Sequence, residues 1–209
     1  MSTRDVCIRP EVKEINMRIF LTGVSCVGKT TVGAKLAALL GCPFFDLDEE
    51  IERFFRVPIE PLQDQFLTMY SFRQEAAKAL TSLLNREEGR DAVIALPPSG
   101  LMDPYWRVVK RANGRIVVLR DEATHILHRL TFYDRDSNLM EKQLTEKEKA
   151  LYLKEIKKDI TYFNRTYKRA DLSVGLSGLG PEQAATKVKE MLEGRWPEGR
   201  GTQQKAPGQ

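Results

Sequence analysis

The feature that most constrains this chain is the stretch at residues 23–31, GVSCVGKTT, which matches the phosphate-loop pattern G-x-x-x-x-G-K-[ST]. A short apolar run at residues 18–22 precedes it, as expected of a buried strand, and residues 30–40 follow it with the apolar spacing of a helix. A glycine-rich turn between a strand and a helix directs several backbone N–H groups and the positive end of the helix at one anion. The sequence therefore predicts a nucleoside triphosphate site here.

The residue types inside this loop suit distinct tasks. Lys29 is expected to reach the β- and γ-phosphates, and the Thr30 hydroxyl is expected to join the shell of a Mg²⁺ ion. Gly23 and Gly28 can adopt backbone angles that are closed to other residues. ATP and Mg²⁺ are therefore the expected cofactors. The remaining expected nucleotide-binding residues of the loop are Ser25, Cys26, Val27 and Thr31.

Strand-like and helix-like segments alternate along the rest of the chain, which favours a parallel sheet covered by helices on both faces. Strands are expected at residues 18–22, 42–46, 91–96, 115–119 and 170–174, and helices at 30–40, 49–55, 61–68, 71–84, 103–112, 124–130, 145–167 and 181–192. The expected fold class is thus α/β: a three-layer α/β/α P-loop fold with a five-stranded parallel sheet.

The domain limits follow from composition. Residues 131–144 lack apolar periodicity and are expected to form a mobile lid loop. Residues 1–16 are expected to be a loose leader, and residues 194–209, which are rich in Gly and polar side chains, a disordered tail. One P-loop domain is therefore expected at residues 17–193.

Bulk composition narrows the partners and the compartment. The net charge of +4 gives no strong argument for nucleic-acid binding. The three cysteines lack C-x-x-C spacing, which argues against a disulfide framework or a zinc site, and no apolar run is long enough to span a bilayer. The sequence therefore predicts a cytoplasmic protein without a membrane partner, with a monomer as the favoured state.

From residue 18 to about residue 192, the layout resembles the shikimate kinase family, within the nucleoside-monophosphate-kinase-like group. The segment IFLTGVSCVGKTTVGAKLAALLGCPFFDLDEEIE carries the resemblance, and it includes Asp46-Leu47-Asp48 where the family has an Asp-x-Asp. The resemblance implies that Asp46 helps to order the Mg²⁺ shell through water. It also implies that Asp48 grips acceptor hydroxyls and orients the attacking one. The neighbouring Glu49, Glu50 and Glu52 are expected on a solvated helix face.

Three arginines extend the resemblance. Arg73, in Ser71-Phe72-Arg73, matches a family arginine that binds the substrate carboxylate. Arg129 and Arg135 occupy positions similar to those of a family arginine near the adenine and of another inside the lid. The resemblance thus adds Arg129 to the nucleotide site and gives Lys29, Asp48 and Arg135 as catalytic residues. The implied partner is a small acceptor that carries a carboxylate or a phosphate.

The acceptor side departs from the family pattern. Where the family has three glycines after the third strand, this chain has Pro97, Pro98 and Ser99. Proline has no N–H to donate, so two consecutive prolines cannot reproduce a surface of backbone amides. A later substrate-binding arginine of the family also has no clear counterpart: Tyr162 falls at that place, and Arg165 is available only if the register shifts.

Three functions remain open on the sequence alone. The first is an ATP-dependent kinase for a small hydroxylated acceptor, with shikimate as the best single candidate. The second is an ATP-binding regulatory or interaction protein without kinase turnover. The third is a nucleotide or nucleic-acid end kinase, supported by the basic stretch at residues 142–169. Because glutamates interleave with those lysines, a solvated helix face with i,i+4 ion pairs is favoured there, and nucleic acid is not the expected partner.

Overall fold

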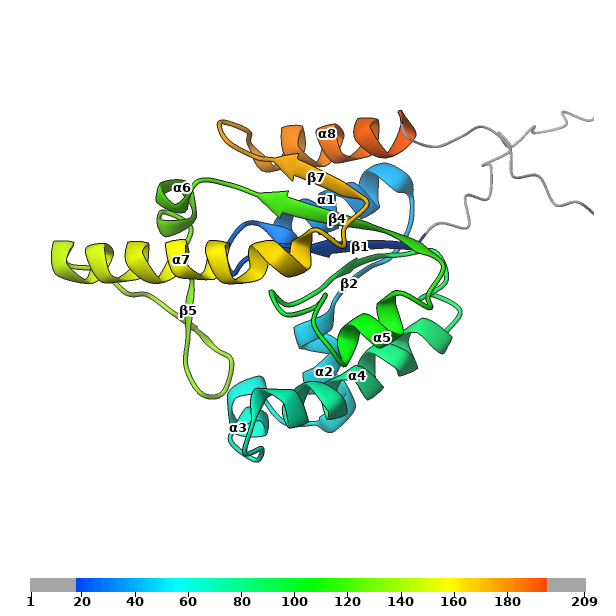
Figure 1. The fold of residues 1–209 in the computed structure, drawn as a ribbon, viewed down its shortest axis with the longest axis horizontal. Helices are drawn as coiled ribbons and strands as arrows, with labels where there is room; N and C mark the ends of the chain where they lie inside the picture. Colours follow the sequence, from blue (N-terminus) through cyan, green and yellow to red (C-terminus); the bar gives the residue numbers. More distant parts are fainter. Residues whose placement is uncertain (1–17, 195–209) are drawn as a thin grey trace, which may run out of the picture.

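The computed structural model describes residues 18–194, which form one twisted parallel sheet with its helices (Figure 1). The expected leader and all but the first residue of the expected tail lie outside the described residues. The five strands are in the order β2-β3-β1-β4-β7, and each neighbouring pair is parallel. The strands are β1 (Arg18–Thr22), β2 (Phe44–Asp46), β3 (Val93–Ala95), β4 (Gly114–Arg120) and β7 (Leu172–Gly175). The predicted fold class is confirmed.

The central strand is β1, the strand that leads into the phosphate loop. Phe20 pairs in register with Ile94 of β3 on one side and with Ile116 of β4 on the other. Phe20 and Ile94 have no exposed surface, as expected for a parallel sheet with both faces covered. The loop is therefore attached to the most deeply buried strand of the fold.

Eight helices flank the sheet within residues 18–194. They are α1 (Lys29–Leu40), α2 (Leu47–Phe55), α3 (Ile59–Gln63), α4 (Met69–Asn85), α5 (Tyr105–Val109), α6 (Ala123–Leu127), α7 (Glu146–Tyr167) and α8 (Pro181–Glu193). Helix α1 packs against α8, α4 packs against α2 and α5, and α6 packs against α7 (Figure 1). None of the helices in this part of the chain combines the length and the apolar character needed to cross a bilayer.

Three helices are clearly shorter than the sequence predicted, and one of them, α6, ends at Leu127 rather than at residue 130. The other two are α3 and α5. The segment expected at 61–68 is helical only in α3, because its last residues form tight turns in which the amides of Gln65 and Phe66 donate three residues back. The segment expected at 103–112 contains α5 alone, since Pro104 at its N-cap begins the helix late and single turns follow it. Both changes shorten helices on the acceptor side of the sheet.

The segment expected to be a mobile lid loop contains a short hairpin. Strands β5 (Phe132–Tyr133) and β6 (Leu139–Met140) pair antiparallel, with Phe132 opposite Met140. The Asp134 carboxylate closes the turn by accepting from the amides of Asp136 and Asn138, at 2.9 Å each. Strands of two residues are too short to produce a periodic pattern in the sequence, so only the turn chemistry could have indicated them.

The expectation that Glu50 lies on a solvated face was also wrong. Glu50 is 5% exposed and makes ion pairs with Arg53 and Arg86, and the Arg86 guanidinium lies 5.5 Å from the centre of the Phe45 ring. A buried carboxylate needs such compensation, since removing a charge from water is costly. Glu50 therefore joins α2 to the end of α4.

Candidate active site

The polar side chains predicted to act on nucleotide and acceptor follow the carboxyl ends of parallel strands. The phosphate loop follows β1, Asp46 ends β2, Pro97 comes two residues after β3, and Asp121 follows β4 directly. Because all the strands of this sheet run the same way, these residues lie along one edge of it. The fold thus brings them to the place where ligands bind in open α/β sheets.

Two glycines shape the phosphate loop. Gly23 has a φ of 151° and Gly28 a φ of 110°, both in the region that disfavours side chains. A Cβ atom on Gly23 would also lie 2.6 Å from the carbonyl oxygen of Leu119. Cys26 has a φ of 56°, so the loop carries a third left-handed residue. The sequence-predicted loop is therefore formed, with its backbone in the conformations that the motif requires.

Lys29 is folded back over the loop. Its Nζ donates to the carbonyl oxygens of Gly23 and Val24, at 3.0 Å each. Burial lowers the pKa of Lys29, and the negative charges of Asp48 and Asp46 oppose that effect. The ammonium is thus within electrostatic reach of the two carboxylates that the sequence predicted for the same site.

Thr30 and Asp46 are in direct contact. The Thr30 hydroxyl donates to Oδ2 of Asp46 at 2.6 Å, and Oδ1 of Asp46 accepts from the amide of Asp48 at 3.1 Å, which caps α2. A hydroxyl and a carboxylate are oxygen ligands of the kind that Mg²⁺ prefers. Residues 18–194 contain no cluster of three or more His, Cys, Asp or Glu side chains suited to a metal. The pair therefore fits a Mg²⁺ ion that keeps most of its ligands as water and phosphate oxygens.

Asp48 has the environment of a general base. Burial, and to a lesser extent the charge of Asp46, raise the pKa of Asp48 to about 6 against the opposing charge of Lys29. Its carboxylate accepts no hydrogen bond from any residue in the described part of the chain. A carboxylate with a pKa just below neutrality is mostly ionised at pH 7 and still able to hold a proton.

Arg73 lies on the acceptor side, in the second turn of α4. Its Nε donates to the carbonyl oxygen of Asp103 at 3.1 Å, which holds the side chain against the turn before α5. Its terminal guanidinium nitrogens make no hydrogen bond within residues 18–194, so they remain available for a bidentate anion contact. Arg73 is thus fixed at one nitrogen and free at the other two.

Tyr105 is a residue that the sequence reasoning missed. It is 1% exposed, and its hydroxyl has no hydrogen-bond partner among the described residues. Burial raises the pKa of Tyr105, the charge of Asp48 raises it further, and the charge of Arg73 lowers it. A single tyrosine in a short apolar segment looks like a core residue, so the sequence held no signal for it beyond its position shortly after Pro97 and Pro98.

The loop after β3 presents few donors. The Gly100 amide donates to the Pro97 carbonyl, and the Met102 amide donates to the Ser99 carbonyl, at 2.8 Å each. The end of α7 holds the loop from outside: the Tyr167 hydroxyl donates to the Pro98 carbonyl at 3.2 Å. Next to it, Arg169 donates to the Leu101 carbonyl at 2.6 Å, and its guanidinium lies 4.9 Å from the centre of the Trp106 ring. The loop at the position of the family's glycines is thus held by four hydrogen bonds and is poor in free N–H groups.

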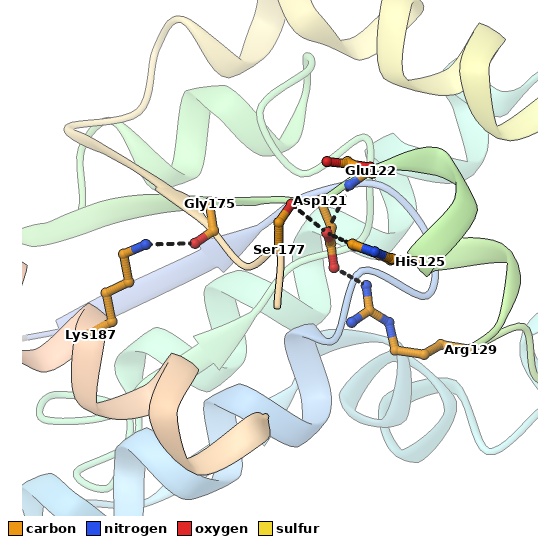
Figure 2. A network of polar contacts seen from close by, with 7 residues as sticks. All are labelled: Asp121, Glu122, His125, Arg129, Gly175, Ser177 and Lys187. Atoms are coloured by element: carbon orange, nitrogen blue, oxygen red, sulfur yellow. Dashed lines mark hydrogen bonds and ion pairs between the residues drawn. The ribbon is translucent and has the colours of Figure 1, made fainter. Parts of the chain in front are cut away.

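Arg129 forms an ion pair with the Asp121 carboxylate (Figure 2). The Asp121 carboxylate also accepts from the amide of Glu122 at 2.8 Å, from the hydroxyl of Ser177 at 3.1 Å and, at 2.9 Å, bonds Nδ1 of His125. Burial alone would raise the pKa of Asp121, but the hydrogen bonds from Arg129 and His125 hold it below its ordinary value. This network joins α6, which carries the lid, to the loop after β7.

Arg135 lies at the tip of the lid and pairs with Asp64 at the end of α3. The neighbouring Ser137 hydroxyl donates to Oε1 of Glu52 at 2.5 Å. The hairpin therefore contacts α2 through Glu52 and the end of α3 through Asp64. The roles expected of Arg129 and Arg135 toward a nucleotide remain predictions.

Comparison with known proteins agrees with this geometry. The chain is 33% identical over 119 residues to shikimate kinase from Novosphingobium aromaticivorans, an alignment covering 56% of this chain and 61% of that relative. Shikimate kinase from Nitrosomonas europaea is 32% identical over 123 residues, 59% of this chain and 56% of the relative. The chain thus matches about three-fifths of the length of these relatives.

Solved structures match over a larger share. A structure of shikimate kinase from Acinetobacter baumannii in complex with shikimate superposes with a TM-score of 0.66 and 25% identity, covering 85% of this chain and 93% of the other. Shikimate kinase from Aquifex aeolicus gives 0.64 and 26%, covering 85% and 97%. The family model for shikimate kinase matches residues 25–193. The chain therefore belongs to the shikimate kinase family.

Proposed function

We propose that this protein is an ATP-dependent phosphotransferase that moves the γ-phosphate of ATP to a hydroxyl of a small anionic acceptor. Shikimate is the best single candidate, because relatives with this family's name share the fold and one of them has been solved with shikimate. The observation that carries the proposal is the convergence of Lys29, the Thr30–Asp46 pair and Asp48 at one edge of the sheet.

Each of these groups has a task in phosphoryl transfer. The loop amides and Lys29 would bind the phosphates, and Thr30 and Asp46 would hold a Mg²⁺ ion, which when bound would neutralise phosphate charge. As the acceptor oxygen bonds to the γ-phosphorus, the bond from that phosphorus to the β–γ bridging oxygen breaks. ADP leaves with the bonding electron pair. The proton of the acceptor hydroxyl passes to Asp48 and then to water. Alignment and charge stabilisation supply most of the catalysis in such a site.

The charge of the acceptor is argued from Arg73. Its free terminal nitrogens form the planar fork that grips a carboxylate at two points, and it lies within electrostatic reach of the same phenol as Asp48. An acceptor held by its carboxylate on Arg73 would present a hydroxyl to Asp48. This arrangement favours a hydroxylated carboxylic acid over a neutral sugar.

The test is Mg²⁺-dependent ADP release by the wild-type protein and by Lys29→Ala, with shikimate and then a panel of hydroxy acids, sugars, nucleosides and oligonucleotide ends. We expect at least one acceptor to raise wild-type turnover to about 1 s⁻¹ or more, the low end of ordinary enzyme rates. Lys29→Ala should lose most of that rate. If no acceptor raises ADP release above the acceptor-free rate, the phosphotransferase proposal is wrong.

A second candidate is an ATP-binding regulatory or interaction protein without turnover. The observation that favours it is the loop at Pro97 and Pro98, which lacks the amide donors found in the family, together with an Arg135 that pairs with Asp64. Tight Mg²⁺-dependent ATP binding without acceptor-stimulated ADP release would support it.

The nucleic-acid end kinase receives less support from α7. Two of its lysines are in ion pairs with glutamates, Lys149 with Glu146 and Lys158 with Glu155, at 2.7 Å each. That helix face carries the ion pairs expected from its sequence, at i,i+3 spacing rather than i,i+4. The monomeric state and the cytoplasmic location expected from the sequence remain predictions.

A further inference from the structure

Tyr105 combines two properties that rarely occur together. It is the largest of the fully buried side chains, at 1% exposure, yet its hydroxyl makes no hydrogen bond within residues 18–194. Burying a hydroxyl without a hydrogen bond costs free energy, and phenylalanine would fill the same space without that cost. Nearly all buried polar groups in native proteins are paired. An unpaired buried donor therefore points to a partner that is present only in another state of the site.

The surroundings of Tyr105 identify that partner. Tyr105 begins α5, two residues after the Asp103 carbonyl that accepts from Arg73 Nε at 3.1 Å. Helix α5 packs against α4, and α4 packs against α2, whose first turn holds Asp48 (Figure 1). The charges of both Asp48 and Arg73 act on the phenol. The hydroxyl is thus within electrostatic reach of both the proposed base and the proposed anion clamp.

The Asp48 carboxylate has the complementary property. It accepts no hydrogen bond from the described residues, although Lys29 attracts it and Asp46, Glu49 and Glu52 repel it electrostatically. One unpaired donor and one unpaired charged acceptor therefore lie within each other's electrostatic reach. A hydrogen bond to a charged acceptor is markedly stronger than one between neutral groups.

We propose that Tyr105 is a positioning residue for the acceptor reaction: its hydroxyl donates to the Asp48 carboxylate when the acceptor is bound and so fixes the orientation of that carboxylate toward the acceptor. The inference rests on the proposed phosphotransferase function. Because the Tyr105 hydroxyl is shielded from solvent, it acts through Asp48 and does not contact the acceptor. The gain is alignment, on which phosphoryl transfer depends strongly.

The test is Tyr105→Phe, which removes one oxygen atom and keeps the shape of the ring. We expect kcat with the best acceptor to fall on the order of 10-fold or more, as for loss of a hydrogen bond to a charged group. The KM for the acceptor and the Kd for ATP should change less than about 2-fold, because neither ligand touches the hydroxyl. The Tm should stay the same or rise, since a buried group without a partner in the free protein is removed.

The matched control is Tyr167→Phe, which removes a buried hydroxyl that has a partner, the Pro98 carbonyl at 3.2 Å. Its Tm should fall, unlike that of Tyr105→Phe. If wild-type protein turns over an acceptor and Tyr105→Phe keeps the full kcat, the inference is wrong and the kinase proposal stands. If the wild-type protein turns over no acceptor, the two fail together.

Discussion

The Tyr167 hydroxyl donates to the Pro98 carbonyl oxygen at 3.2 Å, so the last turn of α7 holds the loop that replaces the family's glycine run. Helix α7 follows the lid directly in the chain. One helix therefore connects the β5–β6 hairpin to the loop after β3.

The double variant Pro97→Gly/Pro98→Gly tests whether this loop sets acceptor specificity. It restores two amide donors, so the KM for shikimate should fall at least about 5-fold, the effect of roughly 1 kcal/mol from a hydrogen bond. The Tm should fall as well, because glycine increases the entropy of the unfolded chain. Steady-state kinetics with shikimate and thermal unfolding provide the two measurements. Pro181→Gly, in the first turn of α8, is the control and should lower the Tm alone. An unchanged KM would show that the prolines do not determine acceptor choice.

The Thr30–Asp46 contact predicts the metal dependence. Asp46→Asn removes one negative charge beside the Thr30 hydroxyl, so the Mg²⁺ concentration for half-maximal rate should rise about 10-fold or more, as is typical when a group that holds or orients a metal is lost. The rate titrated against Mg²⁺ at fixed ATP measures this shift. ATP affinity measured without the metal should not weaken, because Asp46 repels the phosphates. If Asp46→Asn reached its half-maximal rate at the same Mg²⁺ concentration as the wild-type protein, the ion would not be held by Asp46.

The pKa of Asp48 predicts the pH dependence of activity. Because burial raises that pKa to about 6, the ionised base is present above pH 6 and is lost as the pH falls below it. The acid limb of kcat/KM should therefore have an apparent pKa near 6, and Asp48→Asn should lower kcat about 10²- to 10⁴-fold. A rate that is flat from pH 5 to pH 8 would exclude Asp48 as the base.

The raised pKa of Asp48 also predicts how the free energy of unfolding changes with pH. This change runs in the direction opposite to that of the activity. The folded protein binds the Asp48 proton more tightly than the unfolded chain, so the stability associated with this group is full below pH 4 and declines as the pH rises through 6. Asp48→Asn should therefore raise the free energy of unfolding at pH 8 by on the order of 1–3 kcal/mol. The gain should vanish near pH 4, and urea unfolding at the two pH values tests it.

Glu50 should be the most sensitive acidic residue of α2. Glu50→Gln removes the charge that Arg53 and Arg86 share, and it should lower the free energy of unfolding by about 2 kcal/mol, less than a fully buried pair because both arginines are partly exposed. The adjacent, exposed Glu49→Gln is the matched control and should stay within about 0.5 kcal/mol of wild type. Equal losses for the two variants would contradict the structural role of Glu50.

The pair between Arg135 and Asp64 should compete with nucleotide binding. If Arg135 turns to the phosphates when ATP binds, Asp64→Asn removes its alternative partner, and the Kd for ATP should fall about 2- to 5-fold, the range of an exposed ion pair. Asp136→Asn, another lid carboxylate, should leave the Kd unchanged. The effect of Asp64→Asn should diminish at high salt. Equal Kd values for the two variants would show that Asp64 does not compete with ATP for Arg135.

The parts of the fold predicted from sequence were those with local signals. Buried parallel strands are short apolar runs, and the phosphate loop and Asp46-Leu47-Asp48 are contiguous, so each was visible within a few residues. The parts that were missed depend on distant partners. Glu50 is buried because Arg86 lies 36 residues away along the chain, and Tyr105 is notable only because its hydroxyl is unpaired in the folded site. The roles of Arg129 and Arg135 were predicted from their positions along the sequence, and those positions do not determine which carboxylate each arginine pairs with.

Glu52 has a consequence for how the two ligands affect each other. Its Oε1 accepts from the Ile59 amide at 2.8 Å and from the Ser137 hydroxyl at 2.5 Å, so one carboxylate oxygen connects α2, the start of α3 and the tip of the lid hairpin. A molecule that draws the acceptor-side helices inward would thereby draw the hairpin with them. Thermodynamic linkage then requires reciprocity: whatever factor the acceptor adds to the affinity for ATP, ATP must add to the affinity for the acceptor.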